Sequence, residues 1–141
     1  MTSDYQIVPP QRPRLGAPLT LLCSLLIVGQ PAAAGLGASR LLDSISFRGP
    51  GVVLLVALRL LAAALGVAAG LALLGRRPGA AALARLALLS GAAVEVAISL
   101  SPEFPRNQAP GERPLVLAAT LAYYLGWLVY LSRSRRIREI S

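Results

Sequence analysis

Residues 51–100 decide the fold: GVVLLVALRLLAAALGVAAGLALL at 51–74, GRRPG at 75–79 and AAALARLALLSGAAVEVAISL at 80–100. Each apolar run has the length of about 20 residues that a helix needs to cross a hydrocarbon layer of about 30 Å. The basic link between them has room only for a tight turn, so the two helices must lie antiparallel and side by side. This stretch therefore predicts a transmembrane helical hairpin.

Two further apolar runs flank this hairpin, at about 15–38 and at about 115–132. Both are long enough to cross a membrane as helices. Pro31 follows Gln30 near the far end of the first run, and we expect it to kink the helix because proline lacks the backbone N–H. The chain is therefore expected to be all-α, a polytopic transmembrane bundle of four spans.

The predicted bundle covers residues 15–132 and has a polar segment at each end. Residues 1–14 form a proline-rich leader, and residues 133–141 form a basic tail. Of the 141 residues, 55% are hydrophobic and 14% are charged, and the mean hydropathy is +0.65. Charges that collect between long apolar runs are typical of a chain that lipid surrounds between its loops.

The net charge of +8 comes from an excess of arginine over acidic residues, and the chain has no lysine. A nucleic-acid-binding protein needs a basic face on a soluble surface, whereas these arginines flank membrane spans. We therefore expect no nucleic-acid partner. A composition rich in Ala, Leu, Gly, Pro and Arg indicates a GC-rich bacterial genome.

The arginines also predict the orientation, because cytoplasmic loops carry an excess of basic residues. With the N-terminus inside, nine arginines near the spans are cytoplasmic: Arg12, Arg14, Arg76, Arg77, Arg85, Arg133, Arg135, Arg136 and Arg138. Four are outside: Arg40, Arg48, Arg106 and Arg113. Both termini are therefore expected in the cytoplasm.

The first run has an alternative interpretation as a secretory signal peptide. Arg12 and Arg14, the apolar stretch 15–29 and then the alanines at 32–34 resemble the three regions of such a signal. Cleavage after them would leave three spans in the same orientation.

Arg59 and Glu95 are the oppositely charged residues inside the predicted hairpin. Folding the hairpin about Arg77 brings them opposite each other, because they lie equally far from the turn. A single charge at this depth is costly, and pairing offsets part of that cost. We predict an intramembrane ion pair. The alternative is that Arg59 reaches the headgroups while Glu95 is protonated.

Small residues predict where helices pack, because they let backbones approach closely in lipid. The second and third runs offer Gly66, Gly70, Ala84, Ala87 and Gly91, and the fourth run offers Ala118, Ala122 and Gly126. In the folded hairpin Gly70 is expected to meet Ala84, and Ala63 to meet Gly91.

Aromatic and basic residues close the chain. Tyr123, Trp127 and Tyr130 share another face of the fourth run and are expected to anchor it at the membrane interface. The four arginines of the tail are candidates for contact with anionic lipid: Arg133, Arg135, Arg136 and Arg138. The alternative is that they only fix the orientation of the chain.

The stretch 127–138, WLVYLSRSRRIR, resembles the end of the bacterial membrane proteins grouped as the domain of unknown function 2569 family. In that family a tryptophan and a tyrosine end the last helix, and a basic tail with an aliphatic residue follows. The Arg76-Arg77-Pro78 turn and the proline of the first run also look similar. The resemblance implies four spans in a bacterial inner membrane, and no activity.

The chain has no histidine, and Cys23 is its single cysteine. Histidine-based nucleophile pairs and Cys/His metal sites are therefore excluded. Asp4 and Asp43 both fall outside the expected spans, which removes the aspartate pair of an intramembrane protease. We expect no enzyme, no cofactor and no metal.

Two classes of function remain for a bundle of this kind. The first is a non-catalytic accessory, assembly or lipid-contacting protein, which associates with itself or with a larger membrane partner. The second is a small proton-coupled transporter that uses Glu95 as its titrating carboxylate. An arginine at the same depth favours a locked pair, and therefore the first class.

Overall fold

The computed structural model describes residues 16–42, 49–102 and 111–138, and every regular element in these ranges is helical. The predicted leader at 1–14 and the last residues of the tail lie outside them. In chain order the elements are α1 (Ala17–Ser24), η1 (Leu25–Gly29), α2 (Gln30–Leu42), α3 (Pro50–Leu74), α4 (Ala80–Leu100), α5 (Arg113–Arg133) and α6 (Arg135–Arg138).

Four of these helices are long and apolar enough to cross a membrane: Ala17–Ser39, Pro50–Leu74, Ala80–Leu100 and Arg113–Arg133. They fall on the four runs that the sequence predicts, and the third has the predicted bounds. The all-α fold with four candidate spans is confirmed. Such a set of helices indicates a multi-pass membrane protein.

The first span runs on through Pro31, and a π-helical turn precedes the proline. In η1 the backbone widens, so that the Gln30 N–H bonds to the Leu25 carbonyl five residues back. Pro31 has no N–H to give to the carbonyl four residues before it. A wider turn is one way in which a membrane helix accommodates this loss and continues.

The turn between α3 and α4 satisfies the last carbonyls of α3 by a Schellman motif. The Arg77 N–H bonds to the Ala72 carbonyl at 3.0 Å, and the Arg76 N–H bonds to the Leu73 carbonyl at 3.2 Å. Arg76 takes the left-handed conformation, with φ of 49°, that glycine usually supplies. Gly79, with φ of 78°, then starts α4. The expected hairpin is therefore present.

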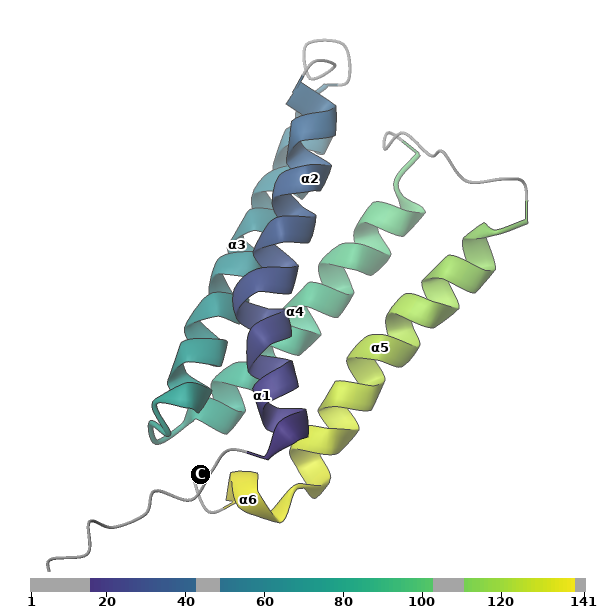
Figure 1. Cartoon of the computed structure of the whole chain (residues 1–141). Coiled ribbons are helices and arrows are strands. Elements are labelled where there is room, and N and C mark those ends of the chain that lie inside the picture. The colour runs from purple at the N-terminus through teal and green to yellow at the C-terminus, as the bar shows by residue number, and fades with distance from the viewer. Residues whose placement is uncertain (1–15, 43–48, 103–110, 139–141) are drawn as a thin grey trace, which may run out of the picture.

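The described ends of the chain, the start of α1 and short helix α6, lie at the same end of the bundle as the α3–α4 turn (Figure 1). The buried core gathers towards this end, with Leu22 and Leu26 of the first span, Leu73 of α3 and Leu88 of α4 fully buried. Away from it, α4 and α5 lean together away from α2 and α3 (Figure 1). The helices of the bundle are therefore packed more tightly at this end than at the other.

Candidate functional site

The structure brings Arg59 of α3 and Glu95 of α4 together. Arg59 Nη2 lies 2.9 Å from Glu95 Oε1, which is the distance of a charge-assisted hydrogen bond. The two side chains keep 23% and 26% of their surface exposed. The pair is therefore half-enclosed between helices, and it is not sealed from the surroundings.

Gly37 of α2 makes room for the Arg59 side chain because glycine has no side chain of its own. A Cβ built at Gly37 would lie 2.5 Å from Arg59 Nη1, closer than real side chains approach. The guanidinium group therefore lies between the backbone of α2 and the carboxylate of α4. Residue patterns did not point to Gly37, because a lone glycine in an Ala/Gly-rich stretch carries no signal of its own.

Gln30, the first residue of α2, adds an amide beside this pair. Its Nε2 and Oε1 atoms are buried, and neither has a hydrogen-bond partner in the described part of the chain. The amide oxygen lies so close to Gly66 of α3 that a Cβ there would overlap it. Sequence analysis singled out Gln30 only as the neighbour of Pro31, and missed it as a polar group inside the bundle.

Tyr124 of α5 is the fourth polar side chain, and it is only 8% exposed. Its ring and hydroxyl lie against Gly91 of α4, where a built Cβ would be 3.0 Å from both the Cε1 and the hydroxyl oxygen. The glycine thus makes room for the phenol. Sequence analysis left Tyr124 out of its candidate sites.

These four polar side chains line one small cleft of about 50 Å³. Its remaining walls are alanines of α2 and α3 together with Gly91 and Val94 of α4. All four candidate spans therefore contribute to a polar site directly beyond the buried core. Small wall residues leave the space open, and the polar groups give it hydrogen-bonding capacity.

The predicted packing glycines of α3 are buried, and the atoms nearest to their built Cβ positions lie on the first span. A Cβ at Gly70 would meet Ile27 Cγ1 at 2.6 Å and the Cys23 carbonyl at 3.3 Å. Those atoms, like the Gln30 amide at Gly66, belong to the first span. The contact of Gly70 with Ala84 stays a prediction. At Gly91 the atoms nearest to a built Cβ belong to Tyr124, and Ala63 lines the same cleft as Gly91. Ala84 and Ala87 are fully buried in the core.

The predicted packing face of the fourth span is exposed in the described part of the chain. Ala118, Ala122 and Gly126 are exposed, and nothing lies within 4 Å of a Cβ built at Gly126. The buried residues of α5 are Tyr124 and Leu131. The small-residue face of α5 is therefore directed away from the other described helices.

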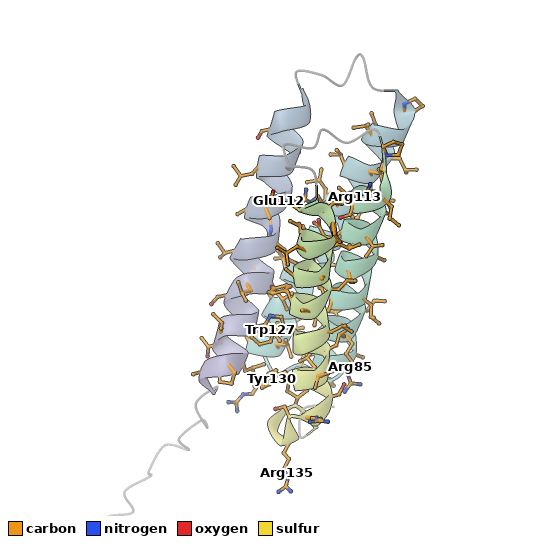
Figure 2. The ribbon with its side chains drawn as sticks, turned by 90° about the vertical axis from the view of Figure 1, so that its right-hand side faces the viewer. Arg85, Glu112, Arg113, Trp127, Tyr130 and Arg135 are labelled. Carbon is orange, nitrogen blue, oxygen red and sulfur yellow. The ribbon has the colours of Figure 1, made fainter. Side chains whose placement is uncertain are left out.

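The aromatic residues of α5 form a chain of edge-to-face contacts. Ring centroids are 6.5 Å apart between Tyr123 and Trp127, and 5.8 Å apart between Trp127 and Tyr130. Trp127 and Tyr130 also pack against the buried core. Figure 2 shows them on the half of the bundle that carries Arg85 and Arg135. Their role as interface anchors stays a prediction.

Part of the basic tail forms the short helix α6. Ile137 of α6 is fully buried in the core, while Arg133 and Arg135 are exposed. The side chains of Arg136 and Arg138 lie outside the part of the chain that the structure describes. At the opposite end Arg113 donates a 2.7 Å hydrogen bond to the Ser99 carbonyl, which ties α5 to the end of α4 (Figure 2).

The fold and the cleft define a multi-pass membrane protein of four helices with a polar site between them. No family model, no curated protein and no solved structure matches this chain. The resemblance of residues 127–138 to the domain of unknown function 2569 family therefore has no support from these comparisons and stays a prediction. Among the described residues, no three His, Cys, Asp or Glu side chains gather to hold a metal ion.

Proposed function

We propose that this chain is a non-catalytic accessory or assembly protein of the bacterial inner membrane. The observation that carries the proposal is the closed contact of 2.9 Å between Arg59 and Glu95. A carboxylate already bound to a guanidinium group clamps α3 to α4. Removing either partner would leave an uncompensated charge at a half-enclosed site, which makes the pair a structural feature.

Two surfaces support an assembly or lipid-contacting role. Helix α5 presents a small-residue face to its surroundings, of the type by which transmembrane helices associate. The α3–α4 turn and α6 bring exposed arginines to the same end of the bundle (Figure 1). Each arginine near anionic lipid contributes about 1 kcal/mol to membrane attraction. We infer that this end faces the cytoplasm and that the protein contacts a second copy or a larger partner.

The folded yield of Glu95→Gln in mild detergent tests the clamp. We expect a lower fraction of monodisperse protein than in wild type, because Arg59 loses its partner. Arg85→Gln is the matched control, since Arg85 is an exposed charge on the same α4 helix. Equal yields for all three proteins would contradict a structural role for the pair.

One observation favours a second candidate, a small proton-coupled transporter. The cleft that reaches Glu95 is lined by polar groups and is not sealed. A carrier needs such access to a carboxylate that binds and releases protons. In reconstituted vesicles with a pH-sensitive dye inside, this candidate predicts proton uptake that disappears in Glu95→Gln while the protein stays folded. A structural clamp predicts no uptake in either protein.

A further inference from the structure

No described protein side chain forms a hydrogen bond with the buried amide of Gln30. Both of its polar atoms are enclosed without a hydrogen-bond partner in the described residues. An unpaired amide in an apolar environment is unfavourable by several kcal/mol. Such groups are rare in folded proteins, and ordered water often satisfies them.

The cleft beside Gln30 meets the physical conditions for such water. Its volume of about 50 Å³ exceeds the roughly 10–15 Å³ that one water molecule requires. A buried water also needs two to four polar partners. Arg59, Glu95 and Tyr124 line the same space as Gln30 and carry polar side chains.

The backbone around Gln30 maintains this arrangement. Gly66 lies against the amide oxygen, and the π-helical turn η1 ends immediately before the residue. Turns of this kind occur frequently at functional sites. The neighbouring walls are alanine and glycine, whose side chains offer no hydrogen bond in place of a solvent molecule. An acyl chain in the same space would leave the Gln30 amide without a hydrogen-bond partner.

We propose that the cleft is a hydrated site, which holds a small cluster of water molecules between the Gln30 amide, the Arg59–Glu95 pair and the Tyr124 hydroxyl. Gln30 is the residue that retains this water. Water in the cleft then contacts the ion pair, whereas the buried core next to the cleft stays dry. This inference is independent of whether the pair acts as a clamp or as part of a carrier.

Hydroxyl-radical footprinting of the full chain in lipid nanodiscs tests the proposal, because radicals generated from bound water modify the side chains beside it. Tyr123 and Tyr124 form an internal comparison. Tyr123 is 37% exposed and lies outside the cleft, whereas Tyr124 is 8% exposed and lines it. We expect Tyr124 to be modified faster than Tyr123, the reverse of the order that exposure alone predicts.

The variant Gln30→Leu should remove this effect. We expect modification of Tyr124 to fall to the rate of Tyr123 or below, while Trp127 keeps its wild-type rate. Ala33→Leu is the second variant, because Ala33 lines the cleft from an exposed position and a larger side chain there narrows the space. It should give the same loss, and it keeps the test available if Gln30→Leu does not fold.

Two results would overturn the proposal. One is a wild-type protein in which Tyr124 reacts no faster than Tyr123, which would make the cleft dry. The other is fast modification of Tyr124 that persists in both folded variants, which would mean that neither the amide nor the space of the cleft holds the water.

Discussion

Single residues show how narrowly the site depends on small side chains. Gly37, Gly66 and Gly91 each lie where an added methyl group would press on a polar side chain, namely those of Arg59, Gln30 and Tyr124. These glycines are therefore part of the polar site although none carries a functional group. The sequence predicted the contact between the two charged side chains. It did not predict which glycines make room for the polar side chains.

The variant Gly37→Ala is expected to destabilise the protein. The new Cβ would force the guanidinium group of Arg59 away from α2, which disturbs its contact with Glu95. Gly35→Ala is the control, because nothing lies within 4 Å of a Cβ at that position of the same helix. There the gain in helix propensity should stabilise by about 0.5–1 kcal/mol. Thermal unfolding in detergent measures both.

An outcome in which Gly37→Ala and Gly35→Ala raise the melting temperature equally would show that Arg59 does not need the space at Gly37. The ion pair would then be more adaptable than the structure indicates.

Helices and turns were predictable to the extent that hydropathy and turn residues define them. The apolar runs gave the four spans, and Gly75 to Gly79 gave the tight turn. Which helix faces contact each other was not predictable. A face of small residues on α5 can pack against another helix of the same chain or against a second protein. The π-helical turn was also missed, since Pro31 alone predicts only a disturbed helix.

Paired substitutions that enlarge one side chain and shorten another can test which helix packs against Gly66 and Gly70. Gly70→Ala should destabilise the protein by about 1–3 kcal/mol, because its Cβ would overlap Ile27 of the first span. Ile27→Ala in the same chain should recover part of this loss, which reversible unfolding can measure. Ala84→Gly is the comparison, and recovery by that change instead would place α4 against Gly70.

The turn before α4 gives a separate test of backbone conformation. Gly79 has φ of 78°, and nothing lies within 4 Å of a Cβ built on it. Gly79→Ala should therefore destabilise by about 1 kcal/mol through backbone strain alone. Gly79→Asn should be milder, because asparagine tolerates this conformation better. Equal unfolding temperatures for the two variants would argue against a left-handed residue in the turn.

At the scale of the whole molecule, a tightly packed end supports a more open polar middle. The core joins the first span, α3, α4 and the tail helix α6 near the α3–α4 turn. Tyr124 of α5 belongs both to this core and to the lining of the cleft, so the two parts of the bundle meet at that residue.

The proposed orientation predicts which end a membrane-impermeant reagent reaches. In a Cys23→Ala background, Gly79→Cys in the α3–α4 turn should be protected in intact cells and labelled after permeabilisation, since that turn is expected in the cytoplasm. Pro102→Cys, after α4, should be labelled in intact cells. The reverse pattern would invert the proposed topology.

The most direct test of the ion-pair clamp is a double-mutant cycle on Arg59 and Glu95. Arg59→Gln and Glu95→Gln should each lower the free energy of unfolding by about 1–3 kcal/mol, less than for a fully buried pair because both side chains are partly exposed. The double variant should lose less than the sum, since neither charge is then left alone. Additive losses, or single variants as stable as wild type, would contradict the clamp and favour Glu95 as a free carboxylate.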